Sequence, residues 1–118
     1  MKKVLVVDDD QDILTLVEMV LSMNNFKVEA ISRWEEMKNK IESFQPDLIL
    51  LDVALIGADG REICKQIKTA SDTKNIPVIL FSAHADVADS LDESMAQGFI
   101  AKPFEISHLV ETLRSNTN

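Results

Sequence analysis

The feature that most constrains the fold is the apolar run at residues 48–51, which Asp47 and Asp52 flank. A short apolar run that follows a turn signal, here Pro46-Asp47, is typical of a strand that is buried on both faces. Asp52 stands where this strand leaves the core. Because a buried carboxylate costs desolvation free energy, we expect a charge partner or a ligand beside it.

Two other apolar runs end at a polar residue in the same way. Residues 4–7 stop at Asp8, and residues 76–81 stop at Ser82. Segments whose apolar residues follow helical spacing separate the runs. The predicted strands span residues 4–7, 27–31, 48–51, 76–81 and 99–101, and the predicted helices span about 10–24, 32–43, 59–68, 86–95 and 104–115.

Five strands that alternate with helices predict an α/β fold: a doubly wound, five-stranded parallel sheet with helices on both faces. Local signals set some of the expected helix ends. Ser32 and Glu35 have the Ser-x-x-Glu spacing of a capping box, which predicts that the second helix begins there. Gly98 is expected to cap the fourth helix, and residues 53–60 are expected to form a loop.

Composition limits the classes of partner. The 118 residues suit one domain spanning 1–118, and 20 acidic against 12 basic residues give a formal net charge of −8. This charge argues against nucleic acid or an anionic membrane as a direct partner and favours a protein or a cation. No apolar run is long enough to cross a membrane, and the amino-terminal residues lack the pattern of a signal peptide, so we expect a cytoplasmic location.

Polar side chains follow four of the predicted strands and should meet at one edge of the sheet, because open α/β sheets bind ligands at the carboxyl ends of their strands. These residues are Asp8, Asp9, Asp52, Ser82 and Lys102. Three neighbouring carboxylates repel one another unless a cation joins them. Their hard oxygens suit Mg²⁺ better than zinc, because neither Cys64 nor the two histidines have the spacing of a zinc site.

The chemistry predicted from this set is acceptance of a phosphoryl group. The charges of three carboxylates, one lysine and Mg²⁺ cancel, so the site can take up an anionic group. Asp52, alone on its strand, is the expected nucleophile, and Asp8 and Asp9 are the expected metal pair. Lys102 and Ser82 would face the phosphoryl oxygens.

The chain contains, in order, the motifs Val6-Val7-Asp8-Asp9, Leu51-Asp52, Gly57, Asp59-Gly60, Phe81-Ser82-Ala83 and Lys102-Pro103-Phe104. These motifs resemble the receiver domain of two-component response regulators, such as the chemotaxis regulators. The resemblance implies a flavodoxin-like strand order 2-1-3-4-5, a cis peptide bond before Pro103, and a signalling role rather than an enzymatic one. In that role a phosphoryl group passes from a sensor histidine kinase or a phosphotransfer protein to the receiver, with Mg²⁺ as cofactor.

The resemblance also assigns roles to single residues. Asp52 would be the phosphoacceptor, and Lys102 would pair with the phosphoryl group. Asp9 would bind Mg²⁺ directly, Asp8 directly or through water, and the backbone carbonyl of Ala54 would be a further metal ligand, beside Asp52 itself.

Ser82 and Phe99 would form a switch, in which the aromatic ring turns as Ser82 moves toward the phosphoryl group. Ala54 and His84 would flank the path of a hydrolytic water. One departure from the family is that Ile56 stands where Pro is usual. The output surface would comprise the fourth helix, the fifth strand and the last helix, and would bind a downstream protein or a second copy. Its acidic face would contain Asp86, Asp89, Asp92, Glu93, Glu105, His108 and Glu111.

Three alternatives use other features of the chain. A dinucleotide-binding domain needs a glycine-rich turn after the first strand, where this chain has Asp8-Asp9-Asp10. Asp8 and Asp10 have the Asp-x-Asp spacing of haloacid-dehalogenase-like phosphatases, whose nucleophile would be Asp8, but Asp12 departs from that motif. The third alternative is a receiver-like module that is never phosphorylated, and the intact set of site residues weighs against it.

Overall fold

The central sheet fixes where the polar strand ends meet. The computed structural model describes residues 1–83 and 91–117, in which five parallel strands form one sheet in the order β2-β1-β3-β6-β7. Counted along the chain, this is the flavodoxin-like order 2-1-3-4-5, so the predicted fold is confirmed. The strands are β1 (Lys2–Val7), β2 (Phe26–Ile31), β3 (Leu48–Asp52), β6 (Val78–Ser82) and β7 (Gly98–Ala101).

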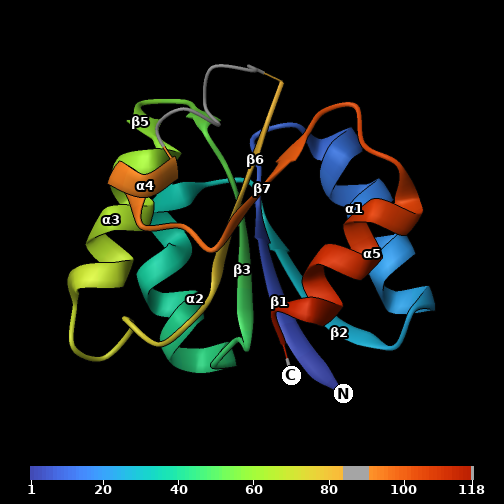
Figure 1. Ribbon diagram of the computed structural model, residues 1–118, viewed down its shortest axis with the longest axis horizontal. Helices are drawn as coiled ribbons and strands as arrows, with labels where there is room; N and C mark the ends of the chain where they lie inside the picture. Colours follow the sequence, from blue (N-terminus) through green and yellow to red (C-terminus); the bar gives the residue numbers. More distant parts are fainter. Residues whose placement is uncertain (84–90, 118) are drawn as a thin grey trace.

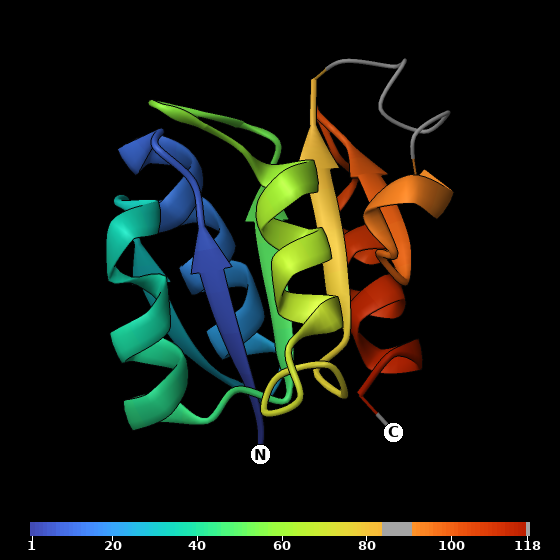
Figure 2. The same ribbon diagram turned by 90° about the vertical axis from the view of Figure 1, so that its left-hand side faces the viewer.

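Helices cover both faces of the sheet, as predicted. In Figure 1, α1 and α5 lie on one side of the strands and α2 and α3 on the other, and both termini lie at the lower edge. Figure 2 shows α3 in front of the strands and α5 on their far side. The helices are α1 (Gln11–Met23), α2 (Met37–Phe44), α3 (Gly60–Thr69), α4 (Leu91–Ser94) and α5 (Ile106–Ser115).

Side chains that alternate along each strand build two hydrophobic cores. All five residues of β3 are buried, which confirms a strand enclosed on both faces. The α1–α5 core contains Val4, Val6, Leu48, Leu50, Ile79, Phe81 and Ile100 with the inner faces of α1 and α5. The α2–α3 core contains Leu5, Val7, Ile49, Leu51, Val78 and Leu80 with the inner faces of α2 and α3.

The capping-box prediction was wrong. A short 3-10 helix, η1 (Trp34–Glu36), precedes α2, and its N-cap is Arg33, whose side chain makes no capping hydrogen bond. The reason is tertiary: the Trp34 ring packs on the α2–α3 core, and its indole N–H donates to the backbone carbonyl of Ile56 at 3.0 Å. These tertiary contacts, rather than the local Ser-x-x-Glu spacing, determine where the helical segment begins.

The predicted C-cap was also wrong, because Gly98 is the first residue of β7. The left-handed conformation expected there belongs to Met95, whose φ is 66°. The predicted fourth helix is described only at α4, and residues 84–90 lie outside the described residues. No helix in the described ranges is long and apolar enough to cross a membrane.

The segment expected as a plain loop contains a small antiparallel hairpin, β4 (Ala54–Leu55) with β5 (Ala58–Asp59). Gly57 occupies its turn with a φ of 80°, a conformation that glycine adopts without strain. The hairpin projects from the end of β3, so it lies beside the strand ends. At the other end, Asp59 caps α3 by accepting a hydrogen bond from the N–H of Arg61.

Residue 60 must be glycine because it lies very close to the backbone of Asp52. A Cβ at Gly60 would lie 2.1 Å from the backbone oxygen of Asp52, whereas a Cβ at Gly98 would meet only the end of the Ile79 side chain, at 3.2 Å. We therefore expect Gly60→Ala to lower the free energy of unfolding by about 3 kcal/mol, and Gly98→Ala to change it by less than about 1 kcal/mol. Urea unfolding of both variants checks this, and equal effects would contradict the packing described.

Candidate functional site

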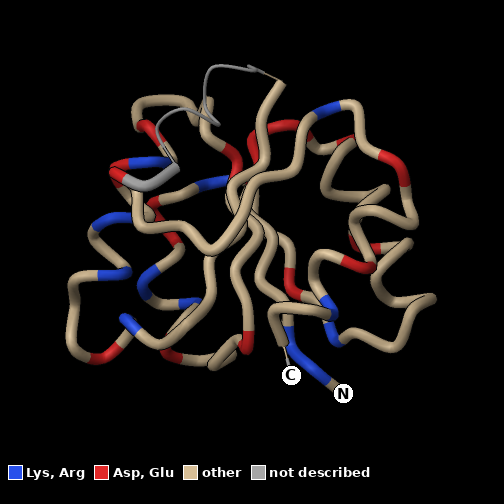
Figure 3. The backbone as a smooth tube through the Cα atoms, in the orientation of Figure 1, with Lys and Arg blue, Asp and Glu red and all other residues tan. Residues whose placement is uncertain are grey.

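Two buried carboxylates share one lysine at the carboxyl end of the sheet. The Nζ atom of Lys102 lies 2.6 Å from Oδ2 of Asp8 and 3.2 Å from Oδ1 of Asp52. Asp8 is 1% exposed and Asp52 is 6% exposed. Figure 3 shows acidic segments gathered at the upper edge, with a basic segment on the loop after β7 beside them. Asp52 therefore has the charge partner that its burial requires.

Strand alternation explains why these three side chains meet. The residue two positions before each of them belongs to the α1–α5 core. Because side chains repeat every second residue along extended backbone, Asp8, Asp52 and Lys102 are directed to the same side of the sheet. The peptide bond between Lys102 and Pro103 is cis, as the resemblance implies.

Phe81 supports the lysine from the neighbouring strand. The Lys102 Nζ lies 4.5 Å from the centroid of the Phe81 ring, a favourable position for a cation over an aromatic face. Phe104 packs on the same ring, with the two centroids 5.4 Å apart. Sequence analysis gave Phe81 no role, and no signal in the sequence distinguishes a core phenylalanine from one that lies under a functional cation.

The pKa of Asp52 is raised above its ordinary value. Burial is the main cause, and the nearby charge of Asp8 adds to it, while Lys102 acts in the opposite direction. Two carboxylates therefore face one ammonium group, and one negative charge remains without a partner when both acids are ionised. The site therefore favours the binding of a second cation, which would neutralise this remaining charge.

Asp9 does not join the other two acids. Its side chain accepts a hydrogen bond from the backbone N–H of Ile56, in the turn of the β4–β5 hairpin. Asp9 lies in a bend beyond the end of β1, and its partner Ile56 follows Leu55, which belongs to the α2–α3 core. In the described part of the chain, no three acidic, histidine or cysteine side chains converge as a metal site.

The donor atoms nevertheless fit Mg²⁺ in kind. Asp8 and Asp52 offer carboxylate oxygens beside an unbalanced charge, Ala54 follows two residues after Asp52, and Asp9 can be added by turning its side chain away from Ile56. Cys64 does not suit a zinc site. It is buried in the α2–α3 core, and burial raises the pKa of its thiol to about 11.

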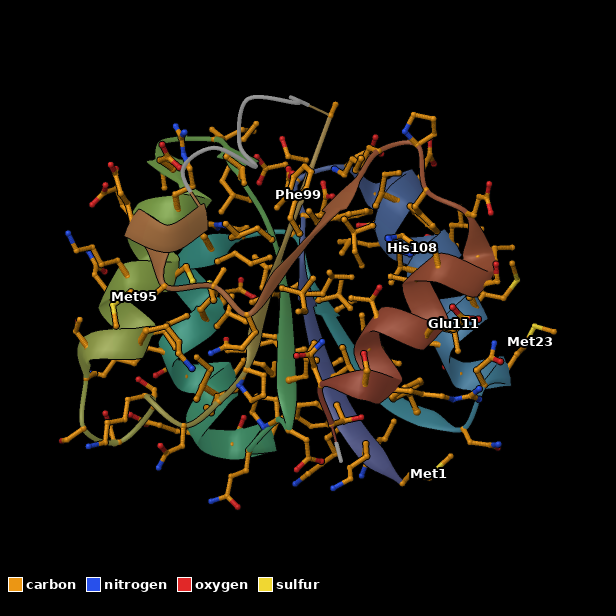
Figure 4. All side chains as sticks on the ribbon, viewed as in Figure 1. Met1, Met23, Met95, Phe99, His108 and Glu111 are labelled. Atoms are coloured by element: carbon orange, nitrogen blue, oxygen red, sulfur yellow. The ribbon has the colours of Figure 1, made fainter. Side chains whose placement is uncertain are left out.

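The two predicted switch residues lie on one face of the sheet. Ser82 ends β6 and is buried, and Phe99 on β7 packs partly buried against the α2–α3 core. Phe99 pairs with Leu80 and Ser82 pairs with Ala101, so Ser82 and Phe99 are diagonal neighbours on adjacent strands. In Figure 4, Phe99 lies between Met95 near α4 and His108 and Glu111 on α5.

The predicted acidic surface is partly described. Glu93, Glu105, His108 and Glu111 are exposed on α4, at the start of α5 and along α5. Asp86 and Asp89 lie outside the described residues, as do the side chain of Asp92 and the predicted water-path residue His84.

Comparison with known protein families gives one family match. Residues 4–114 match the response regulator receiver domain. Among curated relatives, the phosphate regulon transcriptional regulatory protein PhoB of Escherichia coli is 33% identical over 116 residues, which are 97% of this chain and 51% of PhoB. The nisin biosynthesis regulatory protein NisR of Lactococcus lactis is 37% identical over 118 residues, 97% of this chain and 49% of NisR. The chain thus spans about half the length of these relatives.

Solved structures give the same similarity in three dimensions. A putative response regulator from Chloroflexus aurantiacus has a TM-score of 0.90 and 30% identity, with 98% of this chain and 97% of that chain covered. The response regulator TrrA of Thermotoga maritima, solved in complex with Mg²⁺-BeF, has a TM-score of 0.88 and 28% identity, with 98% and 99% covered.

A charge-removal variant tests the account of Asp52. Because its folded-state pKa is raised, the folded state keeps the proton at pH values where the unfolded chain has lost it, and stability falls as pH rises through that range. We expect Asp52→Asn to raise the free energy of unfolding at pH 7, without Mg²⁺, by on the order of 1 kcal/mol. The gain should shrink toward pH 4.

Urea unfolding at both pH values measures this difference. The control is Glu18→Gln, which removes an exposed carboxylate from α1 and should change stability by less than about 0.5 kcal/mol. A loss of stability for Asp52→Asn at pH 7 would contradict the account.

Proposed function

Because the chain belongs to the response regulator receiver domain family, whose general role is phosphoacceptor signalling, we propose that Asp52 is the residue that accepts the phosphoryl group. Asp52 ends the central strand, and its carboxylate lies 3.2 Å from the Lys102 ammonium. This position at the strand end, beside a cation and a second acid, is the observation that carries the proposal.

Asp52 is better placed for attack than Asp8. The Oδ2 atom of Asp8 is held by Lys102 at 2.6 Å, and its Oδ1 atom accepts a hydrogen bond from the N–H of Asp10 at 2.9 Å. Lys102 therefore lies closer to Asp8 than to Asp52, at 2.6 Å against 3.2 Å, which favours a supporting role for Asp8. The same geometry disfavours the phosphatase alternative, in which Asp8 would be the nucleophile.

The proposed reaction moves one phosphoryl group. A carboxylate oxygen of Asp52 attacks the phosphorus of a donor phosphohistidine, the new O–P bond forms an acyl phosphate, and the N–P bond of the donor breaks. Lys102 neutralises charge next to the attacking oxygen and remains near the product. Asp8, Asp9, Asp52 and the Ala54 carbonyl would hold Mg²⁺, which supplies charge neutralisation for the phosphoryl oxygens when bound.

The proposed partners are proteins. A sensor histidine kinase or a phosphotransfer protein would be the donor, and a downstream protein or a second copy would bind the surface of α4, β7 and α5. The net charge of −8 supports a protein rather than nucleic acid as the direct partner of these 118 residues. The transcriptional role in the name of PhoB is a property of a protein about twice as long.

Chemical labelling tests the phosphoacceptor. The protein is treated with a small acyl-phosphate donor in millimolar Mg²⁺, and the modified residue is mapped by mass spectrometry of its peptides. We expect modification of Asp52, its loss in Asp52→Asn, and its retention in Asp10→Asn, which changes an exposed neighbouring acid. Modification of Asp8 would support the phosphatase alternative, and no modification would support the binding module.

A pair of variants tests the switch. Ser82 and Phe99 share a face of the sheet on adjacent strands, so a movement of the hydroxyl toward the phosphoryl group can open space for the ring. We expect the donor to change amide hydrogen exchange in β7 and α5 of the wild type. Ser82→Ala should keep the modification of Asp52 but lose most of that change, as should Phe99→Ala. If both variants respond as the wild type does, the signal leaves by another route.

A further inference from the structure

The backbone of Ile56 is held from both sides. Its N–H donates to the Asp9 carboxylate, and its carbonyl accepts the indole N–H of Trp34 at 3.0 Å. The three residues come from three separate segments: the end of β1, the turn between β4 and β5, and η1. Two hydrogen bonds therefore link Asp9, an expected metal ligand, to Trp34 through the backbone of Ile56.

Only the backbone of Ile56 takes part in this link. Its side chain is 80% exposed, so the side chain contributes little to packing. A backbone N–H is available at this position because the residue is not proline, which has no such donor. The residue that departs from the usual family pattern is therefore the one that binds Asp9.

The link holds Asp9 away from the other acids. Asp8 and Asp52 meet at Lys102 on the α1–α5 side, whereas Asp9 is bound on the hairpin side. Within the described ranges these acids do not form a three-carboxylate cluster. The Ile56 N–H binds the Oδ2 atom of Asp9. A cation that joins all three carboxylates has to draw the Asp9 side chain toward Asp8 and Asp52, and this movement works against the bond to Ile56.

We propose that the Ile56 N–H competes with Mg²⁺ for the Asp9 carboxylate, and that Trp34 is a positioning residue that keeps Ile56 in place for this competition. The inference rests on the proposed Mg²⁺ site. It predicts that the hairpin lowers the affinity for the metal. It also predicts that metal binding affects Trp34, which in the described structure is hydrogen-bonded to Ile56 and to no expected metal ligand.

Removing the donor tests the competition. Ile56→Pro deletes the N–H, and Ile56→Ala keeps it while removing the exposed side chain. We expect Ile56→Pro to bind Mg²⁺ about ten-fold more tightly than Ile56→Ala, because a hydrogen bond to a charged group no longer opposes the metal. Trp34→Phe keeps an aromatic ring but loses the indole N–H, and it should tighten binding about three-fold. Calorimetric titration with MgCl₂ gives the dissociation constants.

Spectroscopy of the wild type gives an independent readout. The chain has one tryptophan, so its single indole N–H resonance belongs to Trp34. We expect the Ile56 amide resonance and the Trp34 indole resonance to shift with MgCl₂ and to give the same dissociation constant as resonances of Asp8 and Asp52. A role of Trp34 in packing alone would leave its indole resonance in place.

The outcomes separate this inference from the function on which it rests. If no resonance at Asp8, Asp52 or Lys102 responds to MgCl₂, the Mg²⁺ site itself is wrong. If those residues respond but Ile56 and Trp34 do not, or if Ile56→Pro binds Mg²⁺ no more tightly than Ile56→Ala, the competition is wrong and the site stands. Should the proline variant fail to fold, the wild-type shifts and Trp34→Phe decide.

Discussion

Two buried carboxylates share one ammonium group, and the rest of the site depends on this imbalance. Asp8 and Asp52 converge on Lys102 because three strands of a parallel sheet end at the same edge with their side chains in the same phase. The fold tolerates the burial of the acids because the Lys102 ammonium lies 2.6 Å from Asp8 and 3.2 Å from Asp52, and Phe81 supports that ammonium. Burial is the main cause of the raised pKa of Asp52, the charge of Asp8 adds to it, and the remaining negative charge favours a second cation.

Much of the fold could be predicted from the sequence, because tertiary contacts did not override the strongest sequence signals, which are the apolar runs. The apolar runs that end at Asp8, Asp52 and Ser82 are enclosed by helices on both sides, and such short runs suit a buried strand better than a helix. The meeting of Asp52 with Lys102, 50 residues apart, follows from the parallel topology.

Weaker local signals failed where tertiary contacts outweighed them. The capping-box spacing at Ser32 did not set a helix end, because Trp34 is fixed by the α2–α3 core and by the Ile56 carbonyl. The side to which Asp9 turns could not be predicted from composition, since the competing donor is a backbone N–H and carries no signature in the sequence. The only available clue was the absence of proline at Ile56.

The arrangement also has a consequence for how the site responds to ligands. Lys102 binds Asp8 and Asp52 on the α1–α5 side of the sheet. Asp9, which follows Asp8 after the end of β1, is bound to the hairpin and through it to Trp34. A cation that draws the three acids together must therefore act on both sides of the sheet. On the proposed function, Mg²⁺, the phosphoryl group and the hairpin would all act on the same excess of negative charge.

The most direct test of this account is an NMR titration of the Asp52 side-chain carboxyl carbon, assigned with the Asp52→Asn protein. The account predicts a midpoint above that of an ordinary aspartate when Mg²⁺ is absent, and a midpoint moved down when millimolar Mg²⁺ is present, because the cation stabilises the ionised form. A midpoint at or below the ordinary value without Mg²⁺, or one that Mg²⁺ does not move, would contradict the account, in which burial and the charge of Asp8 raise this pKa and a cation offsets them.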